Sequence, residues 1–202
     1  MFAIVEIIKD SLYAIRYDDV QDEFENNEFD DNSSNDIFSR IFNNWNDVEY
    51  LEAFFNEHKE DLQREFFNYI SIEEAIYQTI EEANELEDLI LQIAESGKTD
   101  RGQTLQTLFK PLHKKDEDKF PVPGHQKSKL YGTKHRSWLR IYAIRIEENV
   151  FIVTGGAIKL TRTMNEREHL ENELKNLEDV KQFLIENGIV DKDSIEDFMI
   201  EL

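Results

Sequence analysis

Cysteine is absent from this chain of 202 residues, and its few glycines and prolines all lie beyond residue 96. The lack of cysteine excludes disulfides, thiol catalysis and zinc sites that are built from thiolates. The first 96 residues contain none of the seven glycines and none of the three prolines, the two residue types that most strongly interrupt helices. This distribution predicts a largely helical N-terminal half, followed by a segment with more turns.

Long hydrophobic runs are also absent. A membrane-spanning helix needs about 20 consecutive apolar residues, and the longest apolar stretches of this sequence are much shorter. The apolar start MFAIVEIIKD lacks the basic segment and the small-residue cleavage site of a signal peptide. We therefore expect a cytoplasmic protein that has no membrane partner.

The net charge of −21 is distributed unevenly along the chain. Residues 1–100 hold 6 Lys/Arg and 27 Asp/Glu, residues 101–163 hold 13 and 5, and residues 164–202 hold 4 and 12. A basic island therefore lies between two acidic flanks. Because nucleic acids respond to local patches of charge, the island is a candidate surface for a polyanion. The alternative is a solvated surface without a ligand.

The N-terminal half predicts two short strands and two long helices. Residues 2–8 and 12–17 are β-capable, and the acidic, Asn-rich segment 18–35 is expected to be a solvated loop or a disordered insert. Apolar residues at three- and four-residue steps predict helices over 47–69 and 71–96, which form an αα-hairpin. The expected helix caps are Asn46 with Glu49, Ser71 with Glu74, and Gly97 at the end.

The second half predicts strands followed by a helix. Residues 137–146 and 150–154 are rich in aromatic and β-branched side chains, and Gly155-Gly156 is expected to form a bend or a bulge. Thr163 with Glu166 caps an amphipathic helix that ends near Gly188, and a short helix covers residues 194–201.

The expected fold class is α+β, with a small antiparallel sheet, flanking helices and a large N-terminal αα-hairpin. The division is into residues 1–98 and 99–202, or into one compact domain.

Known sequence signatures of nucleotide-binding sites and of serine hydrolases are missing. The chain has no Walker loop, no G-x-G-x-x-G and no G-x-S-x-G. No two of the five histidines form a pair at metal-ligand spacing on a helix. His169 and Glu173 share a helical face that is expected to be solvated. We expect neither a metal nor a cofactor.

The basic island combines cations with aromatic side chains, which bind phosphates and stack on unpaired bases. Strand alternation places Trp138, Arg140 and Tyr142 on one face, which we expect to be accessible to solvent. In the alternative arrangement, Arg140 pairs with an acidic helix and covers the two rings. The expected RNA-binding residues are Lys127, Lys129, Lys134, Arg136, Arg145, Arg162 and Trp138.

Three segments of the island resemble the RelE/HigB-like toxins of bacterial toxin–antitoxin systems. They are WLRIYAI at 138–144, FIV at 151–153 and GGAIKLT at 155–161, and an amphipathic helix follows them. FKPL at 109–112 and KLxG at 129–132 are similar to the sequence segments that precede the corresponding strands of these toxins. The resemblance covers about residues 100–187. The resemblance implies a compact α+β domain that cleaves RNA, often mRNA on the ribosome, and is silenced by an antitoxin.

Metal-independent RNA cleavage uses the 2′-OH of the RNA as its nucleophile. The reaction needs a base, an acid and cations on the phosphate. We expect Arg140 to stabilise the phosphate, with Arg145 as the alternative arginine, and Lys159 to hold the backbone. His135 is the expected acid or base because the ordinary pKa of histidine lies nearest neutrality, and Tyr142 stacks on a base or shuttles a proton.

The alternative function is a non-catalytic, acidic interaction protein. Such a protein binds a basic protein partner or mimics nucleic acid. In a combined version, the acidic segment 18–36 folds over residues 127–162 and masks them.

Overall fold

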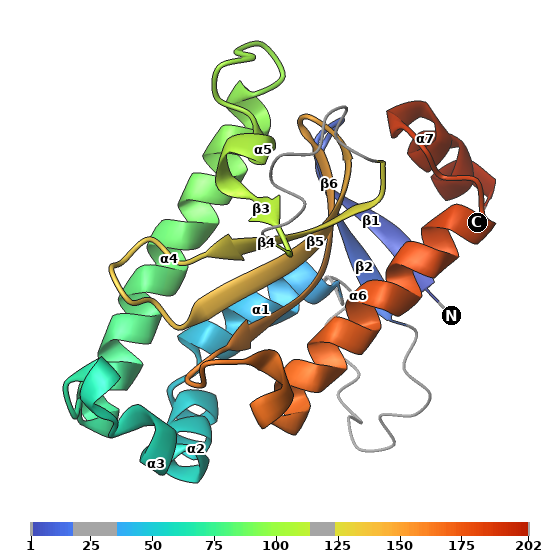
Figure 1. Cartoon of the computed structure of the whole chain (residues 1–202). Helices are drawn as coiled ribbons and strands as arrows, with labels where there is room; N and C mark the ends of the chain where they lie inside the picture. The colour runs from blue at the N-terminus through green and yellow to red at the C-terminus, as the bar shows by residue number, and fades with distance from the viewer. Residues whose placement is uncertain (1, 18–35, 114–123, 202) are drawn as a thin grey trace, which may run out of the picture.

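A computed structural model describes residues 2–17, 36–113 and 124–201, which form a six-stranded sheet with helices on both faces (Figure 1). The α+β class is thereby confirmed. The order across the sheet is β1-β2-β6-β5-β4-β3. The strands are β1 (Phe2–Ile8), β2 (Leu12–Tyr17), β3 (Lys110–Pro111), β4 (Gln126–Tyr131), β5 (Leu139–Glu147) and β6 (Val150–Ile158).

The sheet is mixed rather than wholly antiparallel. β2 pairs with β6 in parallel, and all other neighbouring strands are antiparallel. The sheet is larger than expected because the β1–β2 hairpin joins the strands of the second half. The boundary expected between residues 98 and 99 therefore separates strands of the same sheet and residues of the same hydrophobic core.

Helices cover both faces of this sheet (Figure 1). α1 packs on β2 and β6, α6 packs on β5 and β6, and α4 packs against α1 and α2. The helices are α1 (Ile37–Asn46), α2 (Val48–Glu57), α3 (Lys59–Leu62), α4 (Ile72–Ser96), α5 (Leu105–Leu108), α6 (Glu168–Glu186) and α7 (Lys192–Glu201).

Sequence patterns located some helix ends correctly and missed others. Ser71 and Glu74 form the expected capping box at the start of α4. The helix expected over 47–69 instead ends at Glu57, and short turns follow it. Its cap is Asp47, whose carboxylate accepts from two free N–H groups, and Asn46 is the last residue of α1. α1 itself was not expected.

The C-terminal boundaries differ in a similar way. The Thr163–Glu166 capping box is present, but it begins a 3₁₀ turn, and α6 begins two residues later at Glu168. Residues 18–35 of the acidic segment lie outside the described residues. Within the described parts of the chain, no helix is both long and apolar enough to cross a bilayer.

The Gly155-Gly156 pair lies at a β-bulge, as expected. Tyr142 pairs with Gly155 and Ala143 pairs with Val153, so Thr154 is the extra residue. A Cβ on Gly155 would collide with the carboxyl group of Glu173 on α6, whereas a Cβ on Gly156 would lie 2.9 Å from Ile41 of α1. The two glycines therefore let helices on opposite faces approach the sheet closely.

Candidate anion-binding cleft

Basic side chains from β5 and from the end of β6 meet on the face of the sheet that α6 covers. Arg140 lies on β5, while Lys159 and Arg162 follow the last residue of β6. All three line two adjacent hollows and form the wall between them. The antiparallel pairing of β5 with β6 explains this meeting, because Arg140 pairs with Ala157 and lies near the end of that strand.

The two hollows differ in their aromatic residues. The first, the tyrosine hollow, has a volume of about 470 Å³ and contains Tyr131 and Tyr142. The second, the phenylalanine hollow, has a volume of about 480 Å³ and contains Phe66 and Phe67. We call the two hollows together the basic cleft.

The lining of the basic cleft is depleted of acidic residues. Of the residues that the structure describes, no Asp or Glu lines either hollow, although the chain contains 44 of them. Six cations contribute to the lining, so the cleft attracts anions. They are Arg64, Lys129, Arg136, Arg140, Lys159 and Arg162.

The guanidinium group of Arg140 is held in a fixed orientation. Its Nη1 donates to the carbonyl oxygens of Ser137, at 2.9 Å, and Leu139, at 2.6 Å. The guanidinium carbon lies 4.3 Å from the centre of the Tyr131 ring. Burial lowers the pKa of Arg140, but an arginine remains charged at physiological pH. Neutral carbonyls therefore position the cation without cancelling its charge.

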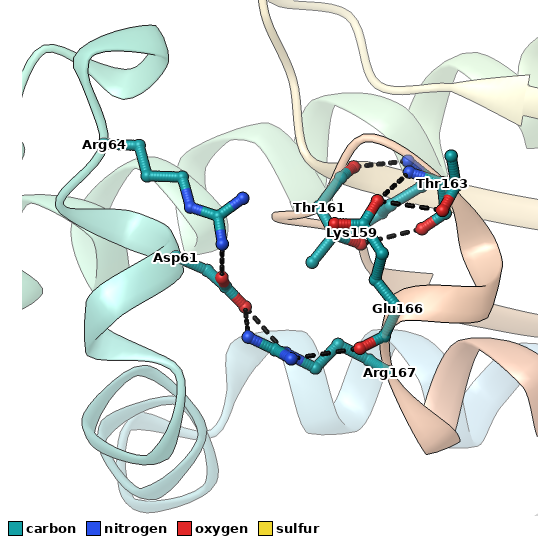
Figure 2. A network of polar contacts seen from close by, with 7 residues as sticks. All are labelled: Asp61, Arg64, Lys159, Thr161, Thr163, Glu166 and Arg167. Atoms are coloured by element: carbon teal, nitrogen blue, oxygen red, sulfur yellow. Dashed lines mark hydrogen bonds and ion pairs between the residues drawn. The ribbon is translucent and has the colours of Figure 1, made fainter.

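Lys159 is held in a similar way. Its Nζ donates to the carbonyl oxygens of Thr161 and Arg162 (the contact with Thr161 is drawn in Figure 2). Burial lowers the pKa of Lys159, and the charge of Arg140 lowers it further. Its ammonium group therefore gives up a proton more readily than that of an ordinary lysine.

The two tyrosines of the cleft differ in accessibility. Tyr142 is 1% exposed, and its hydroxyl group donates to Met164 Sδ at 3.1 Å. Burial raises the pKa of Tyr142, so its hydroxyl keeps its proton. Tyr131 is 47% exposed, and Lys129 Nζ lies 5.5 Å from the centre of its ring. Tyr131 is therefore the ring that a ligand can reach.

Three of the four expected catalytic residues lie together: Arg140, Lys159 and Tyr142 all line the tyrosine hollow. His135 lines another hollow, of about 300 Å³, which shares Phe66, Phe67 and Arg136 with the phenylalanine hollow. The imidazole in the tyrosine hollow is that of His113, which follows β3. Sequence reasoning missed His113, because it lies 14 residues before Lys127, the first of the expected RNA-binding residues, and no local pattern connects the two.

The expected RNA-binding cations are dispersed. Lys129, Arg136 and Arg162 line the basic cleft. Lys127 pairs with Glu178 on α6, and Lys134 pairs with Glu85 on α4 at 2.7 Å.

Arg145 lies outside the basic cleft. Its Nε donates to Gln106 Oε1 at 2.8 Å, and it lines neither hollow. Of the two arginines that could occupy the arginine position of the resemblance, Arg140 is therefore the one that faces the cleft.

The expectation of an accessible row of Trp138, Arg140 and Tyr142 is wrong for both rings. Trp138 is 5% exposed, and its Nε1 donates to Thr79 Oγ1 at 2.9 Å. It precedes the first residue of β5 and packs against Phe55. Since helices cover both faces of the sheet, strand alternation leaves neither face exposed.

Asp61 connects the basic cleft with the start of α6 (Figure 2). Its carboxylate is buried and accepts from Arg64, which lines the phenylalanine hollow, and from Arg167. Arg167 Nη2 lies 2.6 Å from Asp61 Oδ2. One buried carboxylate at the end of α3 thus holds an arginine at the cleft and joins the N-terminal helices to α6.

Replacing Asp61 by asparagine is expected to lower the free energy of unfolding by about 1–3 kcal/mol, since charge-assisted hydrogen bonds to a buried group are lost. Both arginines are partly exposed, and solvation of their charges limits the loss. Urea unfolding measures it, with Asp88→Asn, an exposed position on α4, as the control. Equal stability of the two variants would contradict the role given to Asp61.

Comparison of the chain with known proteins finds no match to a family model, to a curated protein or to a solved structure. Within the described parts of the chain, no group of three or more His, Asp or Glu side chains is arranged to hold a metal ion.

Proposed function

We propose that the basic cleft binds RNA and that the chain is a metal-independent endoribonuclease that acts as the toxin of a toxin–antitoxin system. The observation that carries this proposal is the lining of the cleft. Six cations and no described carboxylate line it, in a chain with a net charge of −21. Repulsion among these cations costs stability, and a bound phosphate chain compensates for that cost.

The aromatic residues of the cleft favour RNA over a simple anion. Tyr131 in one hollow and Phe66 in the other are 47% and 58% exposed. Each ring has an arginine beside it: Arg140 lies over Tyr131, and the guanidinium carbon of Arg136 lies 5.3 Å from the centre of Phe66. Exposed rings and guanidinium planes stack on unpaired bases, so each hollow can receive a base while the shared cations hold a phosphate.

The proposed reaction forms a bond between the 2′-oxygen and phosphorus and breaks the bond between phosphorus and the 5′-oxygen. Arg140 and Arg162 stabilise the charge that develops on the phosphate oxygens. Lys159 in its neutral form accepts the 2′-OH proton, and His113 donates a proton to the departing 5′-oxygen. The products are a 2′,3′-cyclic phosphate and a 5′-hydroxyl end. His113 takes the role first expected of His135.

The direct test incubates the purified chain with end-labelled, single-stranded RNA in the presence of EDTA. We expect fragments that carry 2′,3′-cyclic phosphate ends. RNA that is bound but remains intact would refute cleavage, and RNA that is not bound would refute the proposal as a whole.

Regulated expression in a bacterial host extends this test to the toxin assignment. We expect growth arrest with fragmented mRNA, which is relieved when an antitoxin partner is co-expressed. Normal growth, despite cleavage of RNA in vitro, would argue against a toxin that acts on mRNA.

The affinity for RNA is expected to fall with salt. Each phosphate contact with single-stranded RNA contributes about −0.7 to the slope of log K against log salt concentration, so three or four contacts give about −2 to −3. Arg162 is an exposed cation of the cleft, and Arg162→Gln is expected to make the slope of log K against log salt concentration shallower by about 0.7. Lys127→Gln is the matched control, because Lys127 pairs with Glu178 outside the cleft. Equal slopes for the two variants would place the RNA elsewhere.

A further inference from the structure

A third hollow, of about 540 Å³, lies between α2, the end of β6 and α6. The residues that line it include Tyr50 and Phe54 of α2, with Glu168 and Glu173 of α6. Residues 156–158, at the end of β6, also line it, and Lys159 of the basic cleft follows them directly in the sequence. The proposed RNA site does not use this hollow.

The charge of the third hollow is opposite to that of the basic cleft. Glu57, Glu168 and Glu173 line it. Among the described residues, Arg167 is its one arginine or lysine, and Asp61 already pairs with that arginine. The hollow therefore attracts a cation.

Two histidines complete the lining. The rings of His58 and His169 lie 5.1 Å apart, centre to centre. Burial lowers the pKa of His58, and the neighbouring His169 lowers it further. His58 is therefore neutral at pH 7 and adds no positive charge to the hollow.

Glu173 is an unusual carboxyl group in this setting. It lies against the backbone of Gly155, where no Cβ fits, and its Oε2 is buried without a hydrogen-bond partner. An unsatisfied buried oxygen costs stability and calls for an explanation. Four titratable or charged groups on neighbouring elements interact electrostatically with Glu173. They are Tyr17 of β2, Arg40 of α1, Tyr50 of α2 and Tyr142 of β5.

The aromatic residues of the hollow identify the kind of cation. The rings of Tyr50 and Phe54 stack at 6.5 Å between centres, with 19° between their planes. Tyr50 is 40% exposed. Guanidinium groups stack on such aromatic faces, and their parallel N–H groups bind both oxygens of a carboxylate.

We propose that the third hollow binds a guanidinium group, with Glu173 as its carboxylate partner and the rings of Tyr50 and Phe54 as the wall on which it stacks. A free guanidine compound and an arginine side chain of a bound protein offer the same chemistry. Either ligand would approach the carboxyl group of Glu173 from the hollow that this residue lines.

The proposal predicts a pH dependence with a definite sign. Burial raises the pKa of Glu173 to about 8, so the group is mostly neutral at pH 7 and mostly ionised at pH 9. A guanidinium remains charged across this range and binds the ionised form. Its affinity should therefore rise about tenfold from pH 7 to pH 9, and binding at pH 7 should release about 0.9 proton.

The experiment titrates the full chain with methylguanidinium and, separately, with the peptide acetyl-Gly-Arg-Gly-amide, followed by NMR. We expect saturable chemical-shift changes at Tyr50 and Phe54, and an affinity that rises about tenfold from pH 7 to pH 9. Glu173→Gln mimics the protonated group and so should fold, but it should bind weakly at both pH values. Glu171→Gln, an exposed position on the same helix, is the matched control and should behave as wild type. Lys159→Gln should also leave this binding unchanged, because Lys159 lines only the basic cleft.

The two ligands distinguish the sources of the guanidinium. Tighter binding of the peptide would support an arginine of a protein partner, and equal or tighter binding of methylguanidinium would support a free compound. Three results would overturn the proposal: no saturable binding of either ligand, equal binding by the matching lysine peptide, or wild-type binding by Glu173→Gln.

Discussion

Replacing Arg140 by alanine is expected to slow RNA cleavage by about 100- to 1000-fold, the usual cost of removing one positioned donor from a developing oxyanion. Arg140 lies between the two hollows, and two backbone carbonyls fix its orientation. Its removal takes away a charge that the proposed transition state uses. The measurement is single-turnover cleavage of labelled RNA at saturating protein.

The matched control is Arg145→Ala, five residues further along β5. Arg145 carries the same charge on the same strand, but it binds Gln106 and lines neither hollow. We expect the cleavage rate of this variant to stay within about threefold of wild type, which corresponds to less than about 1 kcal/mol of barrier. Equal losses in the two variants would indicate a general effect of charge or folding, and a loss in Arg145→Ala alone would place the active site elsewhere.

Replacing Trp138 by alanine is expected to lower the free energy of unfolding by about 3–5 kcal/mol, as is usual for a large buried ring. Its indole packs against Phe55 and Phe67, and its N–H group donates to the buried Thr79. The substitution removes these contacts and leaves the Thr79 hydroxyl without this donor. Urea unfolding measures the loss, and the m-value should stay unchanged.

Tyr131→Ala provides the contrast, because this ring is exposed at the cleft. Its stability should stay within about 1 kcal/mol of wild type, and its RNA affinity should fall by about 1–3 kcal/mol, the value of one stacked base. If Trp138→Ala kept full stability and lost RNA affinity, the assignment of Trp138 to the core would be wrong.

The helices and strands that could be predicted from the sequence are those whose ends have local causes. Ser71 and Glu74 begin α4 because their side chains satisfy N–H groups within the same turn. The strands of the β1–β2 hairpin were correctly expected over residues 2–8 and 12–17. β4 was missed, because only Leu130 and Tyr131 of its six residues are apolar and because its pairing with β5 is a tertiary contact.

The cleft could be predicted only in part, for a similar reason. Arg140 and Lys159 come together because β5 and β6 are neighbours in sequence and in the sheet. Arg64 and Phe66 reach the same cleft from the helical N-terminal half, and no local pattern places them there. Strand alternation correctly grouped Arg140 with Tyr142, but it could not indicate that α6 covers that face.

The parallel pairing of β2 with β6 also has a consequence for biosynthesis. Ser11 beside β2 donates to the carbonyl oxygen of Asn149 beside β6, 138 residues later in the chain. At a synthesis rate of about 5–20 residues per second, the nascent β1–β2 hairpin waits roughly 7–30 s for this partner. During that time the apolar residues 12–15 and one edge of β2 lack their native cover, which exposes them to aggregation and favours capture by a chaperone. Lys159 and Arg162 emerge after β6, so the basic cleft is completed only after this last pairing becomes available, and a partial chain on the ribosome cannot have the proposed activity.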